Sequence, residues 1–386
     1  MAVQAPRRPA APPSRAVAPT NVTKRKKRKD PLWARLTVVF GAVLMMASGA
    51  GIVGSKMLIA SATDAITQGK LIADEDADQV TGKSLDGPIN MLLLGVDVRP
   101  DWDINDTRAD TIIVLHIPAS HDQAYLVSIP RDTELTSPAF PSSQWPGGTT
   151  KATEVFFHGA QHGAGWDGGA QLMAKTVKQN TGISFDGAAI IDFGGFKGVI
   201  EELGGVRMCV DQEVKSAHMY WVDGKPLYKA DARKLGRLQE PVVHKKGCRT
   251  MKAWEALDFA RQRYGLKNGD YDRQRHQQQL LKAMAKKATD GGVMSNPLKL
   301  KGLMQAAGKA FTLDTGGVDL ADFIFTLRGV AANDLVLLRT NSGTFSGNSA
   351  GREVFNPESQ AMFEAIKNDR LAEFVIQNPS VVAREK

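Results

Sequence analysis

Charged residues directly follow two apolar segments of the chain. Residues 90–99 read Asn-Met-Leu-Leu-Leu-Gly-Val-Asp-Val-Arg, and residues 127–133 read Val-Ser-Ile-Pro-Arg-Asp-Thr. Each is typical of a buried strand that ends in an Asp/Arg pair, and open α/β sheets bind ligands at the carboxyl ends of their strands. A third segment, 108–117, carries Arg108 and Asp110 ahead of its apolar run. Carboxylates and guanidiniums around three strands predict a site for a metal ion and a polyanion, most simply a phosphate.

A second charged cluster lies later in the chain. Over residues 259–277 it reads Phe-Ala-Arg-Gln-Arg-Tyr and, after a short gap, Gly-Asp-Tyr-Asp-Arg-Gln-Arg-His-Gln. Arg273 and Gln277 are four residues apart and share one face of a helix, whereas Arg261 and Arg263 project to one side of an extended segment. Arginine suits phosphate because its planar fork binds two oxygens at once and stays charged.

Two of the aspartates suit a metal ion. Asp97 and Asp110 offer hard carboxylate oxygens of the kind that hold Mg²⁺ together with substrate phosphates. Taken singly, each charged residue has a simpler role, because a surface arginine is usually solvated or ion-paired and an aspartate after a strand often caps a helix or a turn. Their concentration favours an anion site with a metal ion. The general base is not assigned: Asp97 and Asp132 are candidates, and Asp132 is equally an ion-pair partner for Arg131.

The positive charge of the chain is confined to its N-terminus. The 386 residues carry a formal charge of +8. Residues 1–35 hold ten Lys and Arg against one acidic residue, Asp30, which leaves 39 basic and 40 acidic residues in the rest. Nucleic-acid-binding domains concentrate basic residues on their folded part. We therefore expect no nucleic-acid partner and a disordered, basic cytoplasmic tail over residues 1–35.

An uncharged segment follows this tail. Residues 36–55 are 20 residues long, and a helix of that length covers roughly 30 Å, the thickness of a bilayer core. The basic run 24–29 precedes it and the acidic run 74–78 follows it, which places the N-terminus in the cytoplasm. We predict one transmembrane helix, retained as a signal anchor in the cell membrane, with the remainder of the chain outside the cytoplasm. The alternative is a signal peptide cleaved at residues 60–62, although its apolar core is usually only about 7–15 residues long.

The chain has two cysteines, Cys209 and Cys248, both in the predicted extracytoplasmic part. In an oxidising compartment an isolated pair without metal-binding spacing favours a disulfide. The alternative is two unrelated buried thiols.

Strands and helices alternate along the rest of the chain without internal repeats, which predicts one α/β domain. Strands are expected from about residue 89 and over 112–117, 124–129, 187–193, 206–210 and 335–338. Helices are expected over 169–180, 196–203, 271–287, 298–310, 320–327 and 358–367, with one more capped by Thr250. Residues 134–168 and 211–249 are predicted to be irregular, the first as a functional loop.

These segments resemble the LytR–CpsA–Psr family, whose extracytoplasmic domains are phosphotransferases. The matching pieces occur in the family's order: 90–99, 108–111, 128–133, Lys151, 191–193 with 203–206, and 256–263 with 269–277. The resemblance implies a single mixed-sheet α-β-α domain preceded by one transmembrane helix. Its expected parts are the tail 1–35, the membrane helix 36–55, a spacer 56–86, the phosphotransferase domain 87–376 and a C-terminal tail 377–386.

The resemblance also implies roles for particular residues. Asp97 and Asp110 would hold Mg²⁺, with Mn²⁺ as an alternative, and would form the catalytic set together with Arg131. The side chains expected around the pyrophosphate of a polyprenyl-linked glycan are Arg99, Arg131, Lys151, Arg261, Arg263, Arg273 and Gln277. An apolar pocket between the sheet and the helices would accept the lipid tail.

The function implied is transfer of a glycan phosphate from a polyprenyl-pyrophosphate carrier to the 6-hydroxyl of N-acetylmuramic acid in peptidoglycan. Two alternatives remain open at this stage. A pyrophosphatase that hydrolyses the same carrier requires the same residues. A non-catalytic surface regulator that binds a polyanion or lipid does not require Asp97 and Asp110.

Overall fold

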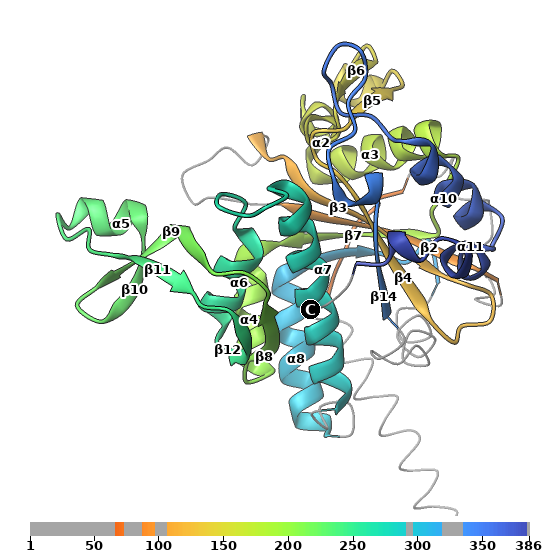
Figure 1. The fold of residues 1–386 in the computed structure, drawn as a ribbon. Coiled ribbons are helices and arrows are strands. Elements are labelled where there is room, and N and C mark those ends of the chain that lie inside the picture. Colours follow the sequence, from red (N-terminus) through yellow and green to blue (C-terminus); the bar gives the residue numbers. More distant parts are fainter. Residues whose placement is uncertain (1–65, 73–86, 97–105, 291–295, 319–334, 384–386) are drawn as a thin grey trace, which may run out of the picture. The chain divides into compact units, whose positions relative to one another are not determined.

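The computed structural model describes residues 66–72, 87–96, 106–290, 296–318 and 335–383, which all belong to one compact unit, Ser55–Lys386. A seven-stranded mixed sheet forms its centre (Figure 1). In spatial order the strands are β1 (Thr67–Gln68), β13 (Phe311–Asp314), β7 (Gly187–Asp192), β2 (Ile89–Val96), β3 (Ala109–Ile117), β4 (Ala124–Ile129) and β14 (Leu335–Arg339). The pairs β2–β3 and β3–β4 are antiparallel, whereas β7–β2 and β4–β14 are parallel.

Helices cover both faces of this sheet because the apolar side chains of its strands alternate between them. Leu92 and Leu94 of β2 belong to one core and Leu93 packs against the other. The first core is covered by α2 (Ala152–Ala160), α3 (Gly165–Thr181), α10 (Pro357–Lys367) and α11 (Leu371–Gln377). The second lies under α4 (Phe193–Glu202), α6 (Ala253–Arg261), α7 (Asp270–Asp290) and α8 (Pro297–Ala310). The predicted mixed-sheet α-β-α domain is confirmed.

The two segments predicted to be irregular contain regular structure. The first holds the pair β5 (Glu134–Ser137) and β6 (Gly148–Lys151), with η2 (Pro141–Ser143) between them, and α2. The second holds β9 (Val214–Val222), β10 (Lys225–Tyr228), α5 (Lys229–Lys234) and β11 (Pro241–His244), which form an arm beside the main sheet (Figure 1). β10 and β11 have only four residues each, and Lys215, Ser216 and His218 interrupt the apolar sequence of β9, so neither length nor pattern marks these strands.

A strand also replaces the predicted helix cap at Thr250. β12 (Gly247–Met251) pairs with β8 (Val206–Val210), and Cys209 and Cys248, directly opposite each other in this pair, are joined by a disulfide. Thr250 lies within β12, and α6 begins only at Ala253. Pairing with β8 therefore keeps Thr250 in an extended conformation, and the helix starts after it.

The domain is longer at both ends than predicted. Leu71, in the predicted spacer 56–86, is fully buried, and its amide donates to Asp314 Oδ2 at 2.8 Å. In the predicted tail 377–386, η5 (Pro379–Val381) buries Val381, and the Ala383 amide bonds to β14. Within the described ranges no helix is long and apolar enough to cross a bilayer. The predicted transmembrane helix 36–55 and the predicted helix 320–327 lie outside those ranges.

Candidate anion site and adjoining cleft

Asp110 and Arg131 meet because β3 and β4 are antiparallel. Their register pairs Ile112 with Ile129. Asp110, two positions before Ile112, therefore lies opposite Arg131, two positions after Ile129. The Arg131 guanidinium forms an ion pair with the Asp110 carboxylate. Thr153, in the first turn of α2, donates to the same carboxylate oxygen at 3.3 Å. Two segments that the sequence identified separately thus form one site.

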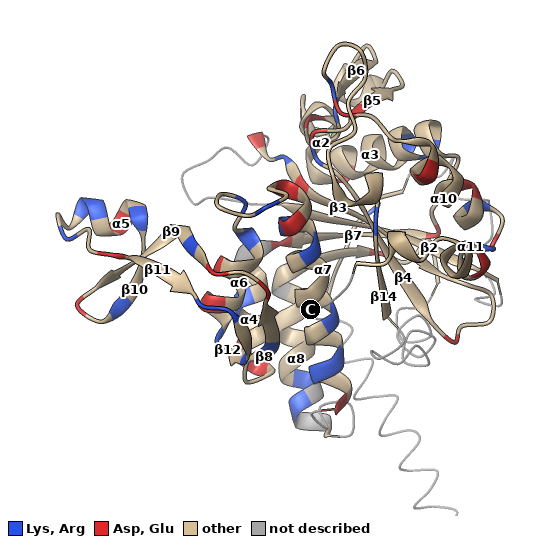
Figure 2. Ribbon diagram, in the orientation of Figure 1, with Lys and Arg blue, Asp and Glu red and all other residues tan. Residues whose placement is uncertain are grey.

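Arg273 reaches this site from α7 and is only 6% exposed. Its Nη2 donates to the backbone oxygen of Asp110 at 2.9 Å and lies 2.8 Å from Asp270 Oδ1. Figure 2 shows the acidic and basic residues side by side at the start of α7. The Nε groups of both Arg273 and Arg131 are buried and have no hydrogen-bond partner. Because buried N–H groups are almost always bonded, these two donors are available to an anion.

The electrostatics of Arg273 point the same way. Burial lowers the pKa of its guanidinium, Asp270 and Asp110 raise it, and the nearby charges of Arg131 and Arg263 lower it again. Three guanidiniums are therefore close enough to repel one another, and an anion between them would relieve that repulsion. Arg263 itself donates to Tyr264 at 2.6 Å, which is the main reason that its pKa is raised.

Lys151 lies at the end of β6 and is 56% exposed. Its Nζ is 2.9 Å from Asp132 Oδ1, and the other Asp132 oxygen is 3.8 Å from Arg131 Nε. The backbone amides of Ala152 and Thr153 bond to the carbonyls of Thr133 and Arg131 at 2.8 and 2.9 Å. The start of α2 thereby fixes the loop that carries Arg131, and Lys151 stands at its edge.

Gln277 lies one helical turn beyond Arg273 and lines an apolar pocket between the sheet and the helices. The pocket is lined by Leu93, Gly95, Thr111, Ile113, Ile191, Phe196, Gln277, Leu280 and Leu281. Its volume of about 20 Å³ compares with the roughly 10–15 Å³ that one water molecule requires. Thr111 Oγ1 and Gln277 Oε1 are buried there without a hydrogen-bond partner. An apolar pocket is present where the lipid tail was predicted, but in this conformation it is closed.

A larger cleft, of about 760 Å³, adjoins the arginine site on the side of Lys151. It is lined by Asp132, Glu134, Thr149, Thr150, Lys151, Glu154, Asn268, Asp270, Tyr271, Phe345, Gly351, Arg352 and Glu353. The Tyr271 hydroxyl donates to Glu353 and accepts a hydrogen bond from Asn341 Nδ2 at 3.1 Å. Burial raises the pKa of Glu353. Neither Tyr271 nor Glu353 was predicted as a site residue from the sequence, and no local pattern marks Glu353.

The structure does not place all the predicted residues. Asp97 and Arg99 lie outside the described residues. Val96, the last described residue before them, pairs with Ala109, the neighbour of Asp110. Arg261 is the last residue of α6. Among the described residues, no group of three or more His, Cys, Asp or Glu side chains could hold a metal ion.

The other side of α7 has a different role. Arg275 pairs with Asp211 and Asp272 at 2.7 and 3.2 Å. His276 is fully buried, stacks on Phe259 and lies 3.6 Å from an Asp211 oxygen. Burial lowers the pKa of His276. These two residues belong to the packing of α7 and do not contact the arginine site.

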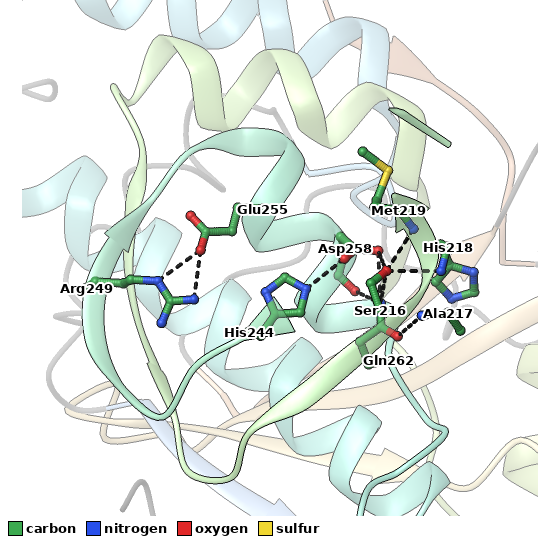
Figure 3. A network of polar contacts seen from close by, with 9 residues as sticks. All are labelled: Ser216, Ala217, His218, Met219, His244, Arg249, Glu255, Asp258 and Gln262. Atoms are coloured by element: carbon green, nitrogen blue, oxygen red, sulfur yellow. Dashed lines mark hydrogen bonds and ion pairs between the residues drawn. The ribbon is translucent and has the colours of Figure 1, made fainter. Parts of the chain in front are cut away.

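A buried polar network at the base of the arm contains Ser216, Asp258 and His244 (Figure 3). Ser216 donates to one Asp258 oxygen at 2.9 Å, and His244 Nε2 bonds to the other at 2.7 Å. In a hydrolytic triad the histidine stands between the serine and the acid, whereas here the aspartate does. The Ser216 hydroxyl also accepts hydrogen bonds from the backbone amides of His218 and Met219. The network joins β9 and β11 to α6 and is structural.

Comparison with known proteins agrees with this architecture. The LytR_cpsA_psr family model matches residues 55–370. A crystal structure of protein gbs0355 from Streptococcus agalactiae superposes with a TM-score of 0.56 at 18% identity, covering 74% of this chain and 88% of that one.

Two curated relatives are similar in sequence. Cell wall biosynthesis protein LcpA of Corynebacterium glutamicum is 24% identical over 344 residues, which is 82% of this chain and 61% of LcpA. A polyisoprenyl-teichoic acid–peptidoglycan teichoic acid transferase, TagU of Oceanobacillus iheyensis, is 29% identical over 269 residues, covering 68% of this chain and 71% of TagU. The chain thus spans less than two thirds of the length of LcpA.

Proposed function

Because the chain belongs to the LytR–CpsA–Psr family, we propose that it is an enzyme, a phosphotransferase that moves a glycan phosphate from a polyprenyl-pyrophosphate carrier to peptidoglycan. The observation that carries the proposal is the arginine site around Asp110, in which Arg131 and Arg273 each keep a buried, unbonded N–H. TagU, a relative named as a teichoic acid–peptidoglycan transferase, supports the same reaction class.

In this reaction, positioning and charge stabilisation do most of the work. Arg131 and Arg273, supported by Arg263 and Lys151 and with Arg99 and Arg261 as further candidates, hold the pyrophosphate oxygens. The acceptor hydroxyl oxygen forms a bond to the phosphorus next to the glycan. The bond from that phosphorus to the bridging oxygen breaks, and polyprenyl phosphate leaves with the electron pair. The guanidiniums of Arg273, which is buried, and Arg131, which is partly buried, stabilise the charge that develops on it, since their ion pairs fix them before the reaction begins.

The residues present fit a divalent metal ion in part. The carboxylate of Asp110 faces the arginine site, where Arg131 supplies its positive partner. Asp97 follows Val96, which pairs with the neighbour of Asp110. We propose that Asp97 and Asp110 hold Mg²⁺, or Mn²⁺ in its place, which neutralises charge on pyrophosphate oxygens when bound.

The apolar pocket beneath Gln277 is the proposed entry point for the prenyl chain. Its lining is almost entirely apolar. The buried polar atoms in it belong to Thr111, which follows Asp110, and to Gln277, which lies one helical turn after Arg273. Since its volume is about 20 Å³, the side chains of α4 and α7 must separate before a lipid enters. Anchoring by residues 36–55 in the cell membrane, with the domain outside the cytoplasm, would present the site to such a carrier.

The acceptor proposed is the 6-hydroxyl of N-acetylmuramic acid in peptidoglycan. The test uses the full chain in detergent micelles with Mg²⁺, a synthetic polyprenyl-pyrophosphate glycan and peptidoglycan oligomers. Mass spectrometry should find a phosphodiester-linked glycan on the acceptor with the wild-type protein and none with Arg131→Ala or Asp97→Ala. Polyprenyl phosphate released without linked product would instead identify a pyrophosphatase. Lipid binding without turnover in any variant would identify a binding protein.

A further inference from the structure

The cleft beside the arginine site is much larger than a pyrophosphate requires. Asp132, Lys151 and Asp270 line it, and Asp132 and Asp270 are the ion-pair partners of Arg131 and Arg273. The cleft therefore opens directly onto the place where the phosphorus would be held. A second substrate that reaches that phosphorus can approach through it.

The lining of the cleft does not suit another polyanion. Five carboxylates face two cations, Lys151 and Arg352, along its walls; they belong to Asp132, Glu134, Glu154, Asp270 and Glu353. Like charges are repelled from such a surface. Thr149, Thr150 and Asn268 add hydroxyl and amide groups, which together with carboxylates match the hydroxyls of a neutral sugar chain.

Phe345 adds an aromatic surface to this cleft. Its side chain is 62% exposed and lines the cleft, whereas phenylalanine is most often buried. The ring rests on Gly347, where an added Cβ would lie 2.7 Å from Phe345 Cε1. The absence of a side chain at Gly347 therefore leaves the space that the ring occupies. An exposed ring face beside hydrogen-bonding groups is suited to the apolar face of a sugar ring.

Glu353 is the carboxylate of the cleft whose surroundings set it apart. It is 6% exposed and accepts a hydrogen bond from the Tyr271 hydroxyl, which Asn341 orients from the other side. Burial raises the pKa of Glu353, and the hydrogen bond from Tyr271 lowers it. The charges of Asp132 and Asp270 raise this pKa further, whereas the charge of Lys151 lowers it. A carboxylate that is harder to ionise is a stronger base once ionised.

We propose that this cleft binds the neutral glycan chain of the acceptor, with Phe345 stacked beneath a sugar ring and Glu353 as the group that receives the proton of the attacking hydroxyl. The inference rests on the proposed transferase function. The hydroxyl oxygen bonds to the glycan-side phosphorus, its proton passes to Glu353, and polyprenyl phosphate leaves with the electron pair of the broken P–O bond. The donor occupies the cationic side and the acceptor the acidic side, so charge separates the two substrates.

The contact between Glu353 and Tyr271 also holds the segment around residue 353 to α7, and the test must separate this structural role from catalysis. Glu353→Gln keeps an oxygen that accepts the Tyr271 hydrogen bond but cannot take a proton. Glu358→Gln is the matched control, because Glu358 accepts a hydrogen bond from the Ser342 hydroxyl at 2.6 Å but does not line the cleft. Phe345→Ala tests the stacking surface separately.

Transfer to peptidoglycan oligomers is measured with the full chain in micelles, together with binding of the polyprenyl-pyrophosphate glycan. Glu353→Gln should lower kcat about 100-fold or more, abolish the acidic limb of the kcat/KM pH profile, and leave donor binding and Tm unchanged. Phe345→Ala should raise the acceptor KM about 3- to 10-fold at similar kcat, and Glu358→Gln should resemble the wild type. Wild-type rates in Glu353→Gln, or an unchanged acidic limb, would overturn the inference while leaving the transferase intact. A wild-type protein without linked product would refute both.

Discussion

The unbonded Nε of Arg273 leads to a sharp test of the arginine site. Arg273→Lys keeps a positive charge beside Asp270 but removes the planar fork that reaches Asp110 and presents the free donor. One charge-assisted hydrogen bond contributes about 1.5–3 kcal/mol, and about 1.4 kcal/mol corresponds to a tenfold change in affinity. We therefore expect pyrophosphate binding to weaken about 10- to 100-fold.

The folding cost of the same change should be moderate. Lysine retains a cation for Asp270 and loses the 2.9 Å hydrogen bond to the Asp110 carbonyl, which contributes about 1.5–3 kcal/mol because its donor is charged. At about 2–4 °C per kcal/mol in a large domain, Tm falls by roughly 3–12 °C. A loss of affinity measured well below the lowered Tm would thus locate the effect in binding.

The assay is isothermal titration of the full chain with Mg²⁺ and inorganic pyrophosphate, and then with the polyprenyl-pyrophosphate glycan in micelles. Arg275→Lys is the control, since Arg275 lies two residues along the same helix and pairs with Asp211 and Asp272 instead. We expect it to bind as the wild type does. The reasoning fails if Arg273→Lys binds pyrophosphate normally, or if both variants weaken equally.

Three further outcomes are expected. Replacing both Cys209 and Cys248 by serine opens a loop of 39 residues. In the chain-entropy model this lowers the free energy of unfolding by about 4 kcal/mol. Urea denaturation measures the loss, and an unchanged midpoint would contradict the prediction. Burial lowers the pKa of His276 below 6.5, so as the pH falls the unfolded chain takes up the proton before the folded chain does. The free energy of unfolding should therefore be greatest above pH 6.5 and decline toward pH 5. Urea denaturation of His276→Phe should show a less steep decline. Leu281→Trp should fill the apolar pocket and weaken binding of the prenyl-linked donor, but an equal loss of inorganic pyrophosphate binding would show that the pocket does not hold the prenyl chain.

Hydrophobic pattern was sufficient to predict most of the main sheet and of the long helices. The segments 112–117 and 124–129 are apolar throughout and are found as β3 and β4. The convergence of Asp110 and Arg131 follows from the antiparallel pairing of these neighbouring strands. A short connection between two strands makes such pairing the expected one, and the site's centre is therefore accessible to reasoning from the sequence.

Residues that meet across long sequence separations could not be predicted in this way. Tyr271 and Glu353 are 82 positions apart, and the C-terminal segment reaches α7 only because β14 pairs with β4 at the edge of the sheet. No periodicity in the sequence indicates that pairing. The arm of β9, β10 and β11 was missed for a different reason: β10 and β11 have only four residues each, and polar residues interrupt the apolar sequence of β9. The buried network around Asp258, which joins the arm to α6, also brings together residues far apart in the sequence (Figure 3).

Helix α7 shows how one element can serve both the site and the core. Its spacing of four places Arg273 and Gln277 on one face, where Arg273 binds Asp110 and Gln277 lines the apolar pocket. Arg275 and His276 fall on another face and are held by Asp211. Of the two arginines at the start of α7, Arg273 thus belongs to the anion site and Arg275 does not.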